Sequence, residues 1–150
     1  MVVSPDVGGV VRARALAKFL DDAELAIIDK RREKENQSQV MNVIGDVKEK
    51  TCILVDDIID TAGTICNAAE ALKDSGAKKV VSYATHAVLS GDALENISNS
   101  RLDELIVTDT IPLSEMATSM NKIKTISMDN TIAEAINRVN KEESISQMFL

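Results

Sequence analysis

Short apolar runs alternate along the chain with stretches of helical periodicity, and this pattern predicts an α/β protein. Runs rich in β-branched residues predict strands that are buried on both faces of a parallel sheet. The predicted strands cover residues 2–3, 25–28, 40–44, 53–55, 78–85, 105–107 and 123–126. The intervening segments predict helices after Gly9, after Thr64, around Asp92 and from Thr131 onward. This order favours a mainly parallel sheet with right-handed crossovers.

Three of the predicted helices have an apolar side. In the first helix this side consists of Val10, Val11, Ala13, Ala17 and Leu20. In the second it consists of Ile65, Ala68, Ala69 and Leu72, at positions i, i+3, i+4 and i+7. The last helix is predicted to start at a capping box, Thr131-x-x-Glu134, and to bury Ile132, Ala135, Ile136 and Val139.

The stretch from Ile53 to Thr64 holds the main candidate site. Its apolar start predicts a strand, and Asp56 and Asp57 are expected where that strand ends. A turn from Asp60 to Thr64 follows, in which Gly63 can adopt backbone angles that a side chain would obstruct. Free N–H groups at the start of the next helix suit a phosphate, with the hydroxyls of Thr61 and Thr64 as further donors. The two carboxylates suit sugar hydroxyls or a hard cation, so the stretch predicts a sugar-phosphate site.

A second polar segment, Ser4-Pro5-Asp6-Val7-Gly8-Gly9, follows the first predicted strand. Gly8 and Gly9 can bring backbone N–H groups close to a ligand at the start of the next helix. Arg12 and Arg14 oppose the dipole of that helix but would be useful beside an anion. Every residue from Asp29 to Gln39 is polar, which predicts a mobile loop on the same side as the site.

Composition narrows the range of functions. At 150 residues the chain is expected to form one domain, and no apolar run reaches membrane-spanning length. The net charge of −7 and an aromatic content of 2% argue against a nucleic-acid or anionic-membrane partner. Cys52 and Cys66 are not spaced as a metal-binding pair and indicate buried thiols in a reducing cytoplasm.

The run from Ile53 to Thr64 resembles the ribose-phosphate motif of the type I phosphoribosyltransferase fold. The resemblance implies a three-layer α/β/α domain over residues 1–150, with a mainly parallel sheet. The short strand at residues 40–44 would be antiparallel to the others. The first strand and the Asp56-Asp57 strand would be neighbours at the point where the strand order reverses, which is where such sheets bind ligands.

Several motifs together resemble the ribose-phosphate pyrophosphokinase (phosphoribosyl pyrophosphate synthetase) family. They are Ser-Pro-Asp-x-Gly-Gly, the Lys-x-Arg of the polar loop, Asp-Asp-Ile-Ile-Asp-Thr-Ala-Gly-Thr, Thr-His-x-x-x-Ser-Gly and Glu-Ser-x-Ser. The resemblance covers essentially the whole chain and implies the C-terminal half of a two-domain enzyme. It implies transfer of diphosphate from MgATP to the anomeric hydroxyl of ribose 5-phosphate. The family also implies a cytoplasmic hexamer, and the chain alone is expected to be inactive without the N-terminal half.

The resemblance also implies roles for individual residues. Asp60, Thr61, Ala62, Gly63 and Thr64 would bind the 5-phosphate, and Asp56 and Asp57 would bind the ribose hydroxyls or their Mg²⁺. Asp6, Gly8 and Gly9 would form the diphosphate loop, with Asp6 as a metal ligand. Lys30 and Arg32 would be the catalytic cations, although Arg31 competes with Arg32 for this role. Ser144 and Ser146 would bind a regulatory phosphate.

Three other functions compete with this interpretation. A base-salvage phosphoribosyltransferase would share the central motif, but it usually has an aromatic residue that stacks on the base. A receiver domain could use Asp109 as its phosphorylated residue, but the turn from Thr61 to Thr64 would then have no role. A non-catalytic regulatory or assembly module of the same fold is the alternative from a different functional class.

Overall fold

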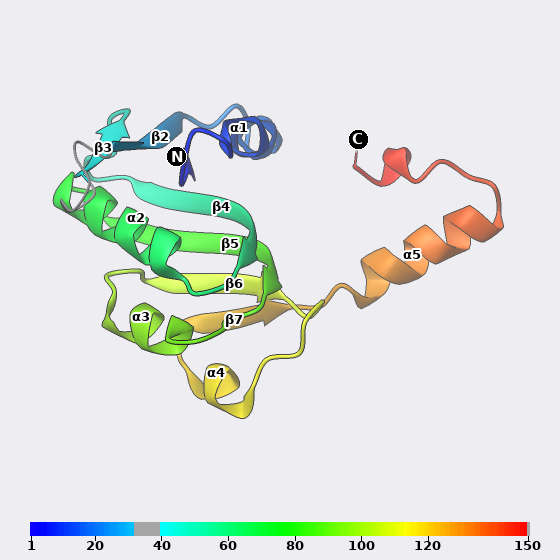
Figure 1. Ribbon diagram of the computed structural model, residues 1–150. Helices are drawn as coiled ribbons and strands as arrows, with labels where there is room; N and C mark the ends of the chain where they lie inside the picture. Colours follow the sequence, from blue (N-terminus) through cyan, green and yellow to red (C-terminus); the bar gives the residue numbers. More distant parts are fainter. Residues whose placement is uncertain (32–39, 150) are drawn as a thin grey trace.

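The computed structural model describes residues 1–31 and 40–149, which form seven strands and five α-helices among the described residues (Figure 1). The strands are β1 (Val2–Ser4), β2 (Leu25–Arg31), β3 (Val40–Ile44), β4 (Thr51–Ile59), β5 (Lys79–Ala87), β6 (Glu104–Thr108) and β7 (Ile123–Ile126). The helices are α1 (Val10–Phe19), α2 (Gly63–Asp74), α3 (Ala93–Asn99), α4 (Glu115–Ser119) and α5 (Asp129–Asn140), followed by the 3₁₀-helix η1 (Ser146–Phe149). The predicted α/β class is confirmed.

The strands form one sheet with the order β3-β2-β1-β4-β5-β6-β7. All neighbouring pairs are parallel except β2 with β3, so the predicted antiparallel strand is confirmed. The chain moves outward from β1 to β2 in one direction and from β4 to β5 in the other. The strand order therefore reverses between β1 and β4, and in open α/β sheets ligands bind outside the carboxyl ends of the strands at such a point.

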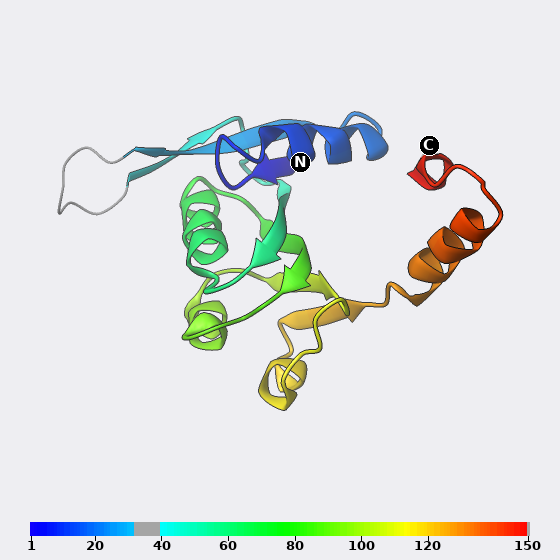
Figure 2. The same cartoon turned by 45° about the vertical axis from the view of Figure 1, so that its right-hand side comes forward.

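Helices pack on both faces of the sheet (Figure 2). Helix α1 packs on one face, where Val2, Ala13 and Ala17 form a small buried cluster against Val55. Helices α2 and α3 pack on the other face, where the large core includes Leu54, Ile65, Leu72, Ile97 and Leu105. The burial of apolar side chains on both faces explains why the inner strands are apolar throughout.

Two strands that carry predicted site residues extend beyond their predicted ends. The sequence placed Asp56 and Asp57 after the strand, but β4 continues to Ile59 because Asp56 and Ile58 pair with residues of β5. Similarly, β2 continues through Asp29 to Arg31, which pairs with β3. Residues 29–31 of the predicted polar loop therefore belong to a strand, since main-chain pairing does not depend on side-chain polarity. The rest of that prediction, residues 32–39, lies outside the described residues.

The apolar side of α1 was only partly predicted. Ala13 and Ala17 are buried as expected, whereas Val11 is 81% exposed and Leu20 is also exposed. Helix α4 was not predicted at all. It has five residues, and its N-cap is Ser114, whose side chain accepts a hydrogen bond from the N–H of Ala117.

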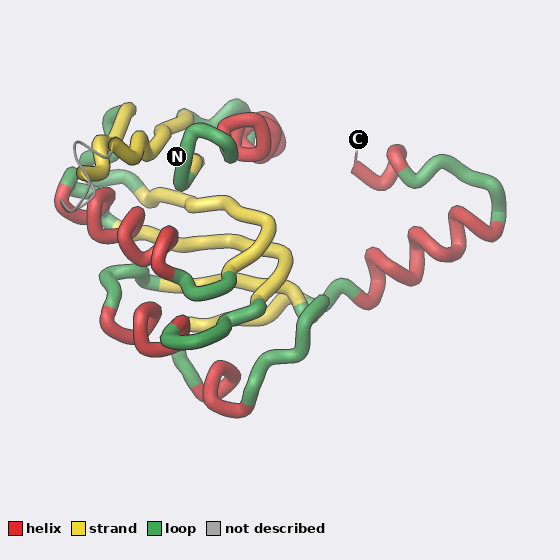
Figure 3. The backbone as a smooth tube through the Cα atoms, viewed as in Figure 1, coloured by secondary structure: helices red, strands yellow, loops and turns green. Residues whose placement is uncertain are grey.

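Helix α5 differs most from the prediction. It begins at Asp129 and has Met128 as its N-cap, so the capping box predicted at Thr131 is wrong. Glu134 instead forms an ion pair with Arg138 at 2.6 Å, one helical turn further on. The apolar side that was expected to be buried is exposed, with Ile136 at 64%. Figure 3 shows α5 leading away from the sheet, after which the chain turns back through η1.

No helix in the part of the chain that the structure describes is both long and apolar enough to cross a membrane. Cys52 and Cys66 are buried free thiols, as the sequence predicted.

Lys122 joins the end of α3 to the start of β7. Its Nζ donates hydrogen bonds to the carbonyl oxygens of Ile97, Ser98 and Ser100, at 3.1, 3.1 and 2.8 Å respectively. The last carbonyls of a helix have no intrahelical partner, and a cation there is also favoured by the helix dipole. Lys122 therefore satisfies carbonyl groups that α3 itself leaves unpaired.

We expect Lys122→Met to lower the free energy of unfolding by about 1–3 kcal/mol, because partly buried carbonyls lose a charged donor. Urea denaturation followed by circular dichroism measures this change. Lys124→Met, at an exposed position of β7, removes the same charge as a control. Equal unfolding free energies for the two variants would contradict this role of Lys122.

Candidate functional site

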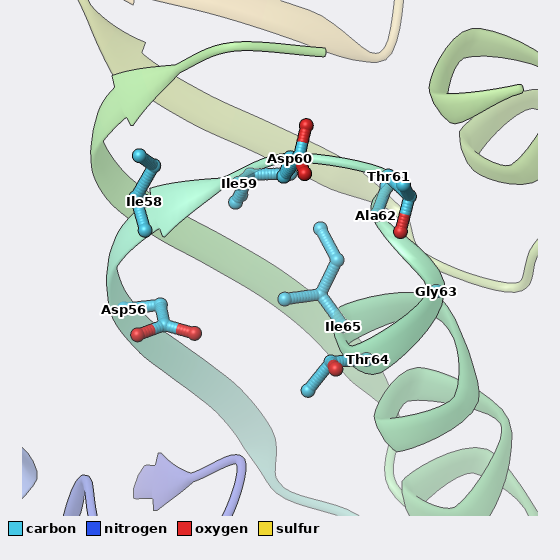
Figure 4. A pocket seen from close by; sticks show the side chains of 9 residues that line it. All are labelled: Asp56, Ile58, Ile59, Asp60, Thr61, Ala62, Gly63, Thr64 and Ile65. Carbon is cyan, nitrogen blue, oxygen red and sulfur yellow. The ribbon is translucent and has the colours of Figure 1, made fainter. Parts of the chain in front are cut away.

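The candidate site lies where β4 passes through a turn into α2, beside the point of strand-order reversal. A cleft of about 160 Å³ opens there (Figure 4). The residues that line it are Asp56, Ile58, Ile59, Asp60, Thr61, Ala62, Gly63, Thr64 and Ile65. The structure thus brings the predicted phosphate-binding turn and Asp56 to one cleft.

The turn positions the start of α2 through an unusual backbone conformation. Ala62 is left-handed, with φ of 61°, and Gly63 is the first residue of the helix. The expectation that Gly63 takes the unusual angles is therefore wrong, and Ala62 takes them instead. The first N–H groups of a helix have no intrahelical partner, so those of Gly63, Thr64 and Ile65 can donate to an anion in the cleft.

The segment after β5 holds this turn in place. Ser90 donates a hydrogen bond from Oγ to Oδ1 of Asp60 and another from its N–H to the Asp60 carbonyl. Asn96 of α3 donates from Nδ2 to the carbonyl oxygen of Thr61 at 3.0 Å. The Thr-His-x-x-x-Ser-Gly motif signalled Ser90, but no sequence pattern indicated Asn96. These two residues position the turn without lining the cleft.

Arg12 of α1 bridges the two carboxylates of β4. Its Nη1 lies 2.7 Å from Oδ1 of Asp56, and its Nη2 lies 2.8 Å from Oδ2 of Asp57. The Asp56 side chain is 24% exposed and that of Asp57 is 60% exposed. The sequence indicated Arg12 only as a cation that could lie beside a bound anion. It gave no sign of the ion pairs with Asp56 and Asp57.

The two carboxylates differ in acidity. Burial raises the pKa of Asp56, although the N–H of Asp57 and the guanidinium of Arg12 act against it. The hydrogen bond with Asp56 lowers the pKa of Asp57, and the charge of Arg12 adds to this effect. On acidification, Asp56 therefore takes up a proton before Asp57 does.

The loop between β1 and α1 is tightly packed on itself. Ser4 donates from Oγ to the carbonyl oxygen of Asp6 at 2.6 Å, and the N–H of Gly9 donates to Oδ1 of Asp6 at 2.9 Å. A Cβ at Gly9 would lie 2.8 Å from Oγ of Ser4, so any side chain there would have to displace the Ser4 hydroxyl. The Asp6 carboxylate is thus turned into its own loop, and it is Arg12 that links this part of the chain to β4.

Of the remaining predicted site residues, two have side chains outside the described part of the structure and two lie in the C-terminal segment. Lys30 belongs to β2 through its backbone pairing with Met41, but its side chain is outside the described part of the structure. Arg32 lies outside the described residues altogether. Ser144 and Ser146 are exposed in the segment that follows α5, away from the sheet. The roles predicted for these four residues stay predictions.

The described carboxylates near the cleft fit a Mg²⁺ ion whose other ligands come from a bound phosphate. Carboxylate oxygens are suitable ligands, and Mg²⁺ is often bound by one or two carboxylates together with substrate phosphates. Within residues 1–31 and 40–149, no group of three or more Asp, Glu, His or Cys side chains could hold a metal ion. The residues present therefore fit a Mg²⁺ ion that also contacts a phosphate-bearing ligand.

The chain resembles known proteins in both sequence and structure. Residues 4–150 match the family described as "Phosphoribosyl synthetase-associated domain". The chain is 65% identical over 148 residues to a ribose-phosphate pyrophosphokinase of Marinomonas sp. and 63% identical over 150 residues to that of Coxiella burnetii. The crystal structure of phosphoribosylpyrophosphate synthetase from Mycobacterium smegmatis is similar, with 40% identity and a TM-score of 0.84 over 94% of this chain.

These matches cover nearly all of this chain but only part of each relative. The chain spans 47% of the two pyrophosphokinases and 45% of the Mycobacterium smegmatis protein. The shares alone do not support the predicted assignment to the C-terminal half. Orotate phosphoribosyltransferase from Aeropyrum pernix, at 20% identity and a TM-score of 0.57, shares the fold.

We expect Asp57→Asn, but not Asp56→Asn, to lower the stability of the fold at pH 7. A raised pKa means that ionised Asp56 opposes folding above its unfolded-state pKa, so its removal should leave the melting temperature unchanged or raise it slightly. A lowered pKa means that ionised Asp57 favours folding in the same pH range, so its removal should lower the melting temperature.

Thermal unfolding followed by circular dichroism measures both effects, and the exposed Asp92→Asn serves as the control for loss of one charge. A larger loss of stability in Asp56→Asn than in Asp57→Asn would contradict a raised pKa for Asp56 and a lowered pKa for Asp57.

Proposed function

Because this chain belongs to the phosphoribosyl synthetase-associated domain family, we propose that it supplies the ribose 5-phosphate site of a ribose-phosphate diphosphokinase. In the proposed reaction, the anomeric hydroxyl oxygen of ribose 5-phosphate forms a bond to the β-phosphorus of ATP. The bond between that phosphorus and the α,β-bridging oxygen breaks, AMP leaves, and the hydroxyl proton is released. The names of the relatives support this activity, and their greater length supports a second half that contributes to it.

One observation carries the proposed substrate: Asp56 and the start of α2 line the same cleft. The N–H groups at the start of α2 and the hydroxyls of Thr61 and Thr64 would bind the 5-phosphate. The acidic groups of β4 would accept hydrogen bonds from the ribose hydroxyls. Ser90 and Asn96 would hold the turn so that few groups need to be ordered when the ligand binds.

The diphosphate side of the site is proposed from the sequence motifs. Asp6, Gly8 and Gly9 would lie beside the transferred diphosphate, with Asp6 or the β4 acidic residues contacting its Mg²⁺. Mg²⁺ bound with the phosphates would neutralise charge that develops during the transfer. Lys30 and Arg32 would add positive charge there, and phosphoryl transfer depends mainly on such stabilisation and alignment.

The rest of the proposal concerns the whole protein. The second half would supply much of the ATP site, and subunits would assemble into a hexamer in the cytoplasm. Ser144 and Ser146 would contact a regulatory phosphate. The chain by itself would bind ribose 5-phosphate without turning it over.

We expect calorimetric titration of the chain with ribose 5-phosphate to give weak, saturable binding. Gly63→Ala should weaken it at least about tenfold, because a methyl group would obstruct the approach of the phosphate to the backbone. Without a ligand, that Cβ would meet nothing nearer than Oγ1 of Thr61 at 3.9 Å, so the variant should fold normally. Asp57→Asn and Thr64→Val should also weaken binding. Each titration is carried out with and without Mg²⁺.

Gly91→Ala is a matched control, because Gly91 has open space around it. Gly91 has a positive φ of 55°, so an alanine there adds strain. The circular dichroism spectrum of this variant is therefore compared with that of the unmodified chain before the titration. Absence of binding by the folded chain, followed by absence of binding after the other half is added, would contradict the proposed substrate. That result would favour a non-catalytic assembly module.

A further inference from the structure

Arg12 occupies an unfavourable position for a cation. It is the third residue of α1, where the helix dipole disfavours positive charge. The first turn of α1 contains no acidic residue that could offset this effect. The compensation comes from a different segment, since Arg12 contacts Asp56 and Asp57 across 44 and 45 positions of the chain.

The contact depends on the planar, forked guanidinium group of arginine. Its two terminal nitrogens reach two different carboxylates at 2.7 and 2.8 Å, so one planar group is shared between them. The ammonium of a lysine is a single point charge and lacks this planar fork. The Oδ1 atom of Asp56 also accepts a hydrogen bond from the N–H of Asp57 at 3.0 Å. Both acidic side chains are therefore oriented from outside β4 by Arg12.

We propose that Arg12 is the resident counter-cation of this site and determines which ligands its carboxylates accept. Arg12 holds Asp56 and Asp57 as acceptors for sugar hydroxyls and denies the pair to a divalent cation that arrives without phosphate. Two adjacent carboxylates without Arg12 would attract such a cation, because carboxylate oxygens are its usual ligands. The identity of the sugar rests on the proposed function, whereas the exclusion of the free cation does not.

The ion pairs of Arg12 affect a divalent cation and a sugar hydroxyl differently. A divalent cation alone must displace a guanidinium that is already paired with both carboxylates. A sugar hydroxyl needs only a free lone pair, and each carboxylate offers several acceptor positions. The paired state therefore favours neutral hydroxyl donors over free cations, and Arg12 acts on specificity as a positioning residue.

The test measures binding of Mn²⁺ alone, as a probe for divalent cations, by electron paramagnetic resonance of the free ion. Arg12→Gln should bind Mn²⁺ at least about fivefold more tightly than the unmodified chain, since two exposed ion pairs no longer compete. Arg14→Gln is the matched control, because Arg14 is exposed on the same helix and forms no ion pair with any described residue. The double variant Arg12→Gln/Asp57→Asn should lose the gain.

Equal or weaker Mn²⁺ binding by Arg12→Gln, compared with Arg14→Gln, would overturn the proposal. A gain that persists in the double variant would overturn it too, since the cation would then bind elsewhere. If Arg12→Gln does not fold, Arg12→Lys decides. Lysine keeps the charge but lacks the planar fork that spans both carboxylates, so a smaller gain is expected and no gain overturns the proposal. Failure to bind ribose 5-phosphate would remove the proposed substrate but leave the Mn²⁺ result unaffected.

Discussion

The parallel pairing of β1 with β4 is the constraint on which the rest of the structure depends. Its register joins Val2 to Ile53 and Val3 to Leu54, with Val2 buried in the small cluster on one face and Val3 in the large core on the other. Because the connections leave in opposite directions, α1 and α2 pack on opposite faces of the sheet. The start of α1 is thereby brought next to the acidic end of β4.

Within this frame, polar contacts from distant segments organise the site. Arg12 orients the β4 carboxylates from α1, whereas Ser90 and Asn96 hold the turn before α2 from the other side. None of these three residues lines the cleft. The cleft therefore owes its shape to surrounding contacts as much as to the motif that lines it, which is how a site can be preorganised for a ligand.

The differences between prediction and structure have two physical causes. Sequence patterns report side-chain polarity, whereas strand length depends on main-chain pairing with a neighbour. Asp56 and Asp29 were therefore assigned to strand ends or loops, although both lie within paired strands. Periodicity also assumes that an apolar side is covered. The apolar side of α5 is periodic as expected, yet no described element covers Ile136.

The sequence by itself determined the α/β class and the turn that begins α2, because apolar runs and turn residues act locally. It also identified the motif from Asp56 to Thr64, all of which lines the cleft except Asp57. The antiparallel orientation of the short strand was implied only by the family resemblance. Only the tertiary structure decided that Arg12 pairs with Asp56 and Asp57 and that Ala62, not Gly63, takes the left-handed conformation. Contacts over more than 40 positions depend on how the strands are ordered, and no local pattern records that order.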